Sequence, residues 1–471
     1  MAGRYEVHPT VLSKMEGQRK FVQVRDACSP EWASDEPTEV PQVQSAEVDP
    51  FGNESDGGVH YKTLQWWQCS FLMIAETISL GILSLPSVIS LMGFIPGILL
   101  IAGFGIIATY TGYIIGQFKL ARPSVHNFAD VGYMIAGPWG EHIVGFAQAL
   151  VFIFIMAAHI LAFSIMMNVL TGHATCSITL AVFGTILSFV LTLPRTLKST
   201  SVFSAASCIS ITAAVFITMV GVGILRPNTG TKVLITLSNI GTLPAYAIGT
   251  SNIIIAFTGH TAYFSFISEL RNPADFPKAL ALLQSMAITF YIVVAVVIYN
   301  YAGDTVASPA LGSTSPLIRK IAYGVASPTI VVAGVVNAHV CVKNVYVRMW
   351  RGTNVIRERS VRSVGSWAGL CLASWILAFL VAESIPVFHE LLGILGALLC
   401  SWFSLGLPSG FWLWLHWGHL GLNWRKRAMA GLNVMIILAC LVVCVLGTYG
   451  SVRAISRSSA SQKPFSCADN S

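Results

Sequence analysis

The sequence predicts an all-α integral membrane protein with about eleven transmembrane helices. Its composition favours a membrane over water, because 54% of the 471 residues are hydrophobic and only 10% are charged. Apolar runs of roughly 20 residues, the length that an α-helix needs to cross a bilayer, follow one another between short polar breaks. Two of these runs contain polar residues and glycines that a plain membrane anchor would not carry, which indicates interrupted helices.

The chain divides into a polar tail, a membrane domain and a short last segment. The expected spans cover residues 66–91, 94–118, 141–170, 175–193, 201–225, 243–268, 278–301, 319–343, 366–385, 389–416 and 428–450. Residues 61–450 therefore form the transmembrane domain, and residues 451–471 form a tail after the last span. The first 60 residues hold 11 of the 21 acidic residues and little apolar periodicity. That composition buries too little apolar surface to offset the entropy of ordering, so we expect residues 1–60 to be disordered.

The distribution of cations predicts which ends of the spans face the cytosol. With the N-terminal tail and every second loop on one side, that side holds 21 of the 28 lysines and arginines. The positive-inside rule then predicts a cytosolic N-terminus and, with eleven spans, an extracellular C-terminus. The basic segment from Lys343 to Arg362 fits a topology determinant or a surface for anionic membrane lipids. Cations scattered between apolar spans do not form a nucleic-acid-binding patch, so no nucleic acid partner is expected.

Cysteines and acids give no support to a metal centre or to catalysis. The ten cysteines show no Cys-x-x-Cys or Cys/His metal spacing, and most lie in apolar spans as small packing residues. Cys176 and Cys467 fall on the same predicted side of the membrane and can pair. The spans contain no paired acids, no nucleophile with a base and no phosphate-binding loop. We therefore expect neither an enzyme nor an ATP-driven pump, and no metal or cofactor.

The first interrupted span reads I-A-E-T-I-S-L-G-I-L-S-L-P from Ile74 to Pro86. Its carboxylic acid, Glu76, suggests a function, because a charged group at mid-bilayer costs at least about 2.5–3.5 kcal/mol. Gly81 weakens the helix and Pro86 removes a backbone donor. Backbone groups freed in this way need partners inside the protein. We interpret the span as a broken helix, although an ordinary kink would also explain Gly81 and Pro86 taken alone.

The sixth span is interrupted in a similar way by Thr258-Gly259-His260-Thr261. The two interruptions lie in spans one and six, five spans apart, as expected if spans 1–5 and 6–10 form a 5+5 repeat of inverted topology. Interrupted helices at matching positions of two such halves are the best sequence indication of a transporter's binding site. The pattern therefore favours a secondary transporter whose broken helices 1 and 6 hold the substrate.

The two breaks suit a zwitterionic substrate, because broken helices expose N–H groups with partial positive charge and carbonyls with partial negative charge. We expect backbone from Ser79 to Ile82 to bind a carboxylate, and carbonyls from Ala256 to Thr258 to bind an ammonium group. Phe257 and apolar residues of spans three and eight are expected to line the side-chain pocket. The candidate substrate-binding residues are Thr77, Ser79, Leu80, Gly81, Ile82, Ala256, Phe257, Thr258 and Gly259.

Two titratable residues at the breaks are candidates for proton coupling, Glu76 and His260. Glu76 either carries a proton or only stabilises the break. His260 either relays a proton, as a group that titrates near neutral pH, or bonds a carbonyl. His159 in span three and His339 in span eight are interpreted as packed polar residues.

The residues around both breaks resemble the amino acid/auxin permease family of the amino acid–polyamine–organocation superfamily. Ile74–Pro86 resembles the family's first span, and Phe257–His260 with Glu269–Leu280 resembles its sixth span and the following cytosolic loop. Segments typical of the fungal branch, which includes the N-system or methyltryptophan-resistance permeases, are Tyr301–Asp304, Ser308–Ser313, and His339–Lys343 with Tyr346–Arg348. Thr258 departs from the family pattern, because many relatives have two glycines before the histidine, so the substrate range is not carried over.

This resemblance implies a LeuT-like fold and a function. The implied function is proton-coupled symport of neutral aliphatic and aromatic amino acids across the plasma membrane by alternating access, with the proton gradient as the driving force and no cofactor. Two alternatives stay open: an amino acid sensor with a transporter fold, and a vacuolar amino acid exporter of the same family.

Overall fold

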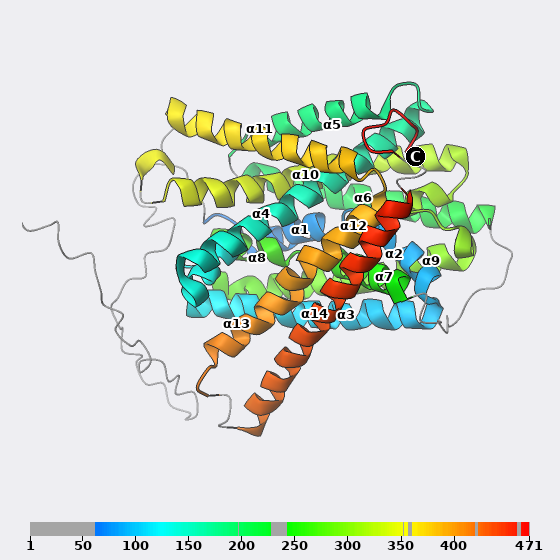
Figure 1. Ribbon diagram of the computed structural model, residues 1–471. Helices are drawn as coiled ribbons and strands as arrows, with labels where there is room; N and C mark the ends of the chain where they lie inside the picture. Colours follow the sequence, from blue (N-terminus) through cyan, green and yellow to red (C-terminus); the bar gives the residue numbers. More distant parts are fainter. Residues whose placement is uncertain are drawn as a thin grey trace, which may run out of the picture. The chain divides into compact units, whose positions relative to one another are not determined.

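In the computed structural model the chain forms a bundle of α-helices (Figure 1). The structure describes residues 62–195, 197–227, 243–351, 353–356, 360–419, 423–458 and 463–470. Within these ranges the only β-type pairing is an isolated bridge between Leu64 and Leu270. The expectation of an all-α fold is confirmed. The expected disordered tail, residues 1–60, lies outside the described residues.

The helices follow one another in the order that the apolar runs predict. The α-helices are α1 (Trp66–Thr77), α2 (Gly81–Met92), α3 (Phe94–Ala121), α4 (Phe128–Thr171), α5 (Ser177–Thr192), α6 (Leu197–Leu225), α7 (Leu243–Ala256), α8 (His260–Glu269), α9 (Phe276–Ala302), α10 (Pro316–Met349), α11 (Val361–Ser384), α12 (Phe388–Leu395), α13 (Leu407–Leu415) and α14 (Trp424–Ser458). Short 3₁₀-helices are η2 (Pro273–Asp275), η3 (Gly303–Thr305), η4 (Ala310–Ser313) and η5 (Asn354–Ile356). Two π-helical turns, η6 (Gly396–Cys400) and η7 (Trp402–Gly406), join α12 to α13.

Most of the expected spans are long and apolar enough to cross a membrane. Eight helical stretches in the described ranges meet this condition, and α1 with α2 forms a ninth that is bent by 50°. The two other expected spans are α5, which has only 16 residues, and the sixth span, which is divided between α7 and α8. The interruptions expected in spans one and six are therefore present, while the count of eleven stays a prediction.

The helix α4 is longer than the third expected span because it begins in a segment expected to be a loop. Asn127 caps its start, since the Asn127 side chain accepts a hydrogen bond from the N–H of Asp130 at 3.0 Å. Gly137 then leaves helical geometry with φ of +65°, a conformation that glycine adopts without strain. The part of α4 after Pro138 corresponds to the expected span 141–170.

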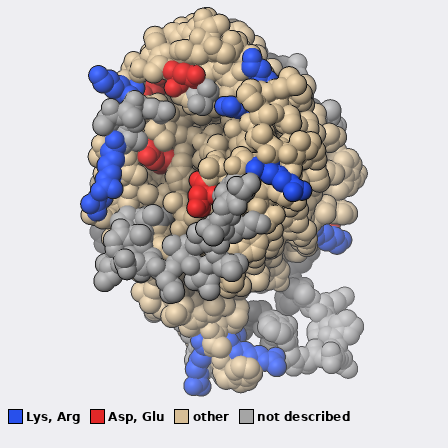
Figure 2. Space-filling view, turned by 90° about the vertical axis from the view of Figure 1, so that its right-hand side faces the viewer, with Lys and Arg blue, Asp and Glu red and all other residues tan. Residues whose placement is uncertain are grey.

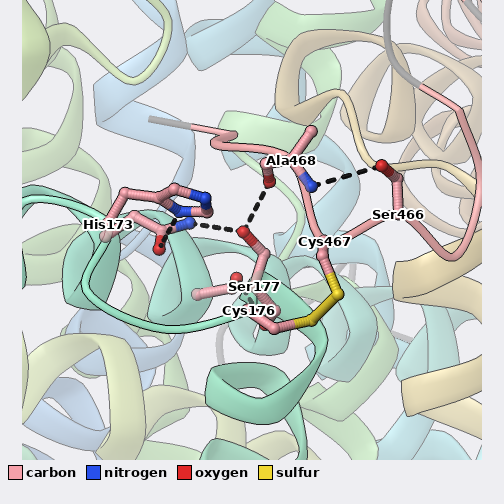
Figure 3. Close-up of a disulfide and its surroundings, with 8 residues drawn as sticks. His173, Cys176, Ser177, Ser466, Cys467 and Ala468 are labelled. Carbon is pink, nitrogen blue, oxygen red and sulfur yellow. Dashed lines mark hydrogen bonds between the residues drawn. A yellow bond between two sulfur atoms is a disulfide. The ribbon is translucent and has the colours of Figure 1, made fainter.

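Connecting segments gather at two ends of the bundle (Figure 1). We call the end that carries residues 172–176 and 463–470 the disulfide end, because Cys176 and Cys467 are bonded there (Figure 3). We call the end that carries residues 122–127 and 271–275 the opposite end. The disulfide between Cys176 and Cys467, which the sequence left open, is thus present. The expected packing role fits the other intramembrane cysteines, since Cys69, Cys208, Cys371, Cys400 and Cys440 are buried and Cys444 is half-buried.

The C-terminal tail lies on the disulfide end and is held by more than the disulfide. The Ser177 hydroxyl donates a hydrogen bond to the Ala468 carbonyl at 2.6 Å (Figure 3). The Asn168 amide donates to the Asn470 side chain at 2.7 Å. The N–H of Phe465 donates to the carbonyl of Glu383 at 3.1 Å. The tail therefore joins α4, α5 and α11. Figure 2 views the disulfide end face-on, where uncharged residues cover most of the surface and charged side chains are few.

The basic segment at the opposite end is engaged with acids of the same chain. Its ion pairs are Lys343 with Glu269, Arg348 with Glu141 (3.0 Å) and Arg351 with Asp130 (3.0 Å). Lys343, which the sequence suggests is a loop cation, is buried within α10. These contacts weaken the lipid-binding interpretation for the segment and favour a structural role. Arg357 and Arg359 lie outside the described residues.

Candidate functional site

The two helix breaks lie directly against each other. The non-helical residues are 78–80 between α1 and α2, and 257–259 between α7 and α8. Gly81 begins α2 so close to the end of α7 that a Cβ atom at Gly81 would lie 2.5 Å from the Cα of Ala256. A Cβ atom at Gly259 would lie 2.6 Å from Oγ1 of Thr77. Both glycines are therefore required by contact between the breaks, in addition to their effect on the helices.

A small cavity of about 30 Å³ lies beside this contact. Its lining includes six residues predicted at the site: Glu76, Thr77, Ser79, Leu80, Gly81 and Thr258. The other lining residues are Ile155, Ala158 and His159 of α4, Ile255 of α7 and Leu392 of α12. Pockets for small organic ligands usually measure about 300–1,000 Å³. The cavity therefore lies where a binding site is expected, but it is much smaller than pockets that hold small organic ligands.

Five predicted residues do not line the cavity: Ile82, Ala256, Phe257, Gly259 and His260. Phe257 was expected in the side-chain pocket, but its ring packs on Tyr291 with the ring centres 5.0 Å apart. Span three supplies cavity residues as expected, whereas span ten contributes Leu392 and none of the lining residues comes from span eight. Ala256 ends α7 and Gly259 belongs to the break, and both lie in the contact between the two breaks.

Glu76 is buried in the last turn of α1 and faces the break in span six. Its side-chain neighbours include the Thr77 hydroxyl at 3.5 Å from Oε2. A Cβ atom at Gly259 would lie 3.1 Å from the same oxygen. In the described part of the chain no lysine, arginine or histidine forms an ion pair with Glu76. An intramembrane carboxyl group thus lies at the meeting point of the breaks without a cation to balance it.

His260 begins α8 and points away from the cavity toward α3. Its Nε2 atom lies 2.9 Å from the carbonyl oxygen of Ala108 and 3.1 Å from Oγ1 of Thr111. Its ring packs on Tyr263 with ring centres 4.8 Å apart. Of the two alternatives for His260, the geometry fits the one in which the histidine bonds a carbonyl. In this position His260 attaches the start of α8 to α3.

Tyr291 of α9 connects the two breaks, and sequence reasoning missed it. Its hydroxyl oxygen lies 3.0 Å from the carbonyl oxygen of Thr77 and 2.6 Å from that of Ala256. These carbonyls end α1 and α7, where intrahelical donors run out. One buried hydroxyl group therefore lies against both helix ends and shares its single proton between the two carbonyls, of which that of Ala256 is the nearer. In the sequence Tyr291 is one tyrosine within an apolar run, so only its contacts distinguish it.

A family model described as transmembrane amino acid transporter protein matches residues 62–453. The chain belongs to this family. The transporter is 32% identical over 424 residues to the N amino acid transport system protein of Neurospora crassa, covering 88% of this chain and 90% of that protein. It is 24% identical over 396 residues to the amino acid transporter AVT1D of Arabidopsis thaliana, covering 80% of this chain and 68% of that protein. The family expected from the residues around the breaks is confirmed, and with it the general expectation of amino acid transport.

Solved structures similar to the transporter have the LeuT fold, which confirms the expected fold class. MhsT in complex with L-phenylalanine is similar with a TM-score of 0.53 and 12% identity, over 85% of this chain and 100% of that chain. A Na⁺-coupled sialic acid symporter in a substrate-bound outward-open state is similar with a TM-score of 0.50 and 11% identity, over 86% of this chain and 91% of that one. At these identities the likeness concerns the fold alone.

Thr258, the residue at which the transporter departs from the family pattern, connects the break to span ten. Its hydroxyl donates to the carbonyl of Ile254 at 2.8 Å and lies 3.1 Å from the hydroxyl of Ser404. Ser404 belongs to the π-helical turn η7, and such wide turns occur frequently at functional sites. The hydroxyl is thus used inside the protein, which fits a role in holding the break against span ten.

Proposed function

We propose that this transporter is a proton-coupled symporter that imports neutral aliphatic and aromatic amino acids by alternating access. The observation that carries the proposal is the contact of the two helix breaks at Gly81 and Ala256, beside a cavity lined by Glu76, whose carboxyl group forms no ion pair within the described residues. Family membership supports amino acid transport in general. Three further features support the finer statement.

The helix ends at the cavity have the polarity that an amino acid needs. The amino end of α2 begins at Gly81, and amide groups at a helix start favour a carboxylate. The carbonyl end of α7 lies beside it at Ala256 and favours an ammonium group. Apart from Glu76 and His159, the residues that line the cavity are uncharged, and Ile155, Ala158, Ile255 and Leu392 are apolar. This lining supports a substrate with a neutral side chain.

The small cavity supports alternating access. About 30 Å³ holds on the order of one or two water molecules, which is less than an amino acid needs. The substrate therefore enters only when the half-helices around Gly81 and Ala256 separate or tilt. Because α1 and α2 are distinct helices bent by 50°, one half of the span can move while the other stays packed.

Sidedness is supported by two independent features. Disulfides persist on the extracellular or lumenal side of membranes and are rare on the cytosolic side, which favours the disulfide end as the outer end. The excess of cations on the other side of the spans favours a cytosolic opposite end. Both support a cytosolic N-terminus and an extracellular C-terminus. With this orientation we propose the plasma membrane as the location and import as the direction.

Uptake of radiolabelled L-phenylalanine and L-leucine at pH 5 and pH 7, with and without a protonophore, tests the proposal. We expect faster uptake at pH 5 and loss of accumulation with the protonophore. Glu76→Gln is expected to retain substrate binding but to lose concentrative uptake, because a glutamine cannot carry a proton. Uptake that depends neither on pH nor on the protonophore would refute proton coupling. Binding without uptake by the wild-type protein would instead indicate an amino acid sensor.

A further inference from the structure

His159 of α4 lies in the cavity with one ring nitrogen bonded and the other free. Nδ1 lies 2.8 Å from the carbonyl oxygen of Ile330 on α10. Because a carbonyl only accepts, Nδ1 carries the proton of the neutral ring and Nε2 offers a lone pair. Among the described residues Nε2 has no hydrogen-bond partner, although the side chain is only 3% exposed. Buried polar atoms are rarely left without a partner, so this one needs an explanation.

The contact between His159 and α10 depends on a glycine. A Cβ atom at Gly334 would lie 3.0 Å from the Cβ of His159. The absence of a side chain at Gly334 therefore lets α10 approach α4 closely enough for the carbonyl of Ile330 to orient the imidazole ring. The orientation leaves Nε2, and not Nδ1, as the ring nitrogen without a described partner, in a side chain that lines the cavity together with Glu76.

Carbonyls near the end of α7 already accept hydrogen bonds, which leaves fewer lone pairs for an ammonium group. The carbonyl of Ala256 accepts from Tyr291. The carbonyls of Ile254 and Ile255 accept from the hydroxyl and the N–H of Thr258. An ammonium group has three N–H donors, and each needs an acceptor when the group is buried. Nε2 of His159, a residue that lines the same cavity, is an acceptor without a partner among the described residues.

We propose that His159 is a substrate-binding residue whose Nε2 accepts a hydrogen bond from the α-ammonium group of the amino acid. This inference rests on the proposed function, since it assumes a neutral amino acid in the cavity. Glu76 lies in the same lining, as the proposed proton carrier, while His159 supplies the acceptor that orients the ammonium group. Of the three residues that α4 contributes to the cavity lining, Ile155 and Ala158 are apolar and His159 is polar.

Two substitutions of His159 test the roles of its two ring nitrogens separately. His159→Asn places an amide N–H near the position of Nδ1, so it keeps the bond to Ile330 but loses the acceptor at Nε2. His159→Gln reaches farther and places an amide oxygen near Nε2. His339→Asn is the matched control, because His339 is a buried histidine of α10 that packs on Trp367 and does not line the cavity.

The test is equilibrium binding of L-phenylalanine to the purified full-length protein, with 3-phenylpropionate as a competitor that lacks the ammonium group. We expect His159→Asn to weaken L-phenylalanine binding by about 10–100-fold, the usual effect of losing a hydrogen bond to a charged group. His159→Gln should recover part of the loss, and the affinity for 3-phenylpropionate should stay unchanged. Unchanged L-phenylalanine affinity in His159→Asn, equal weakening of both ligands, or equal weakening in His339→Asn would overturn the inference. Absence of binding to the wild-type protein would instead refute the proposed function.

Discussion

Gly81 is a residue at which the first and sixth expected spans come into very close contact. The atom that a side chain at Gly81 would meet first is the Cα of Ala256, at 2.5 Å, which belongs to the backbone and cannot rotate away. The sequence indicates Gly81 as a helix-weakening residue. The structure adds a steric reason that no local pattern contains, because Ala256 is far away in the chain.

Gly81→Ala is expected to impair both stability and transport. Overpacking of a close contact typically costs about 1–3 kcal/mol, and here the strain falls on the two breaks. The measurement is the apparent Tm of the purified protein together with amino acid uptake. Gly103→Ala in α3 is the control, because a Cβ atom there meets nothing within 4 Å. Equal behaviour of the two variants would contradict the steric argument.

Tyr291→Phe removes the hydroxyl whose single proton is shared between the carbonyls of Thr77 and Ala256. The loss of this buried donor leaves a carbonyl without its partner, which costs about 1–3 kcal/mol. We expect a lower apparent Tm and slower uptake, since the ends of α1 and α7 are no longer held to α9. Tyr299→Phe, two turns further along the same helix, should have a smaller effect on uptake. A Tyr291→Phe variant with normal uptake would show that the hydroxyl does not hold the breaks.

How far the site can be predicted depends on the kind of contact involved. Glu76 stands out in the sequence because an acid is rare in a membrane span, and Gly81 and Gly259 stand out because polar residues surround them. Tyr291 is ordinary in type, and His159 was interpreted as a packed polar residue; both become informative only through partners that lie on other helices. Phe257 was misjudged for the same reason, since nothing local shows that its ring faces Tyr291 and not the cavity.

At the scale of helices, the start of α1 and the end of α8 are tied together. The N–H of Leu64 donates to the carbonyl of Glu269 at 3.1 Å, and the N–H of Arg271 donates to the carbonyl of Leu64 at 2.9 Å. The side chain of Glu269 forms the buried ion pair with Lys343 of α10. The opposite end of the bundle is therefore closed by three elements that meet at Glu269. Opening toward that end requires this junction to change.

Breaking the Lys343–Glu269 pair from one side is expected to be costly. Removal of one partner of a buried pair leaves an uncompensated charge and costs about 3–5 kcal/mol, whereas replacing both by uncharged groups is often nearly neutral. Lys343→Met alone should therefore lower the apparent Tm strongly, and Lys343→Met with Glu269→Gln should recover most of it. Additive losses in the double variant would show that the two residues act independently.

Helix order and the positions of both breaks follow from the sequence, but some helix boundaries do not. Apolar runs and polar interruptions identify the spans because the bilayer imposes their length and polarity. The early start of α4 at Phe128 has a local cause, the cap by Asn127, which a search for apolar runs does not detect, and no polar interruption marks the π-helical turns near Ser404. Lys343 was expected at a loop because lysine is rare in spans, yet Glu269 on another helix allows its burial.

At the scale of the whole molecule, the disulfide makes the orientation measurable. Cys176→Ser leaves Cys467 as an exposed free thiol at the disulfide end. If this end is extracellular, a membrane-impermeant maleimide should label Cys467 in intact cells. Wild-type protein, in which Cys467 is bonded, is the control and should not be labelled at this position. Labelling of Cys467 only after permeabilisation would place the disulfide end in the cytosol and reverse the proposed orientation.

The contact at Gly81 also limits how the sequence can vary in evolution. A clash between two side chains can be compensated when one becomes smaller, so such positions change in pairs. The clash at Gly81 is with a backbone atom of residue 256, and no substitution at that position removes it. Relatives in which these half-helices cross at the same distance should therefore keep glycine at the position of Gly81, whatever residue stands opposite. A relative with a larger residue there should differ in the distance between the two breaks.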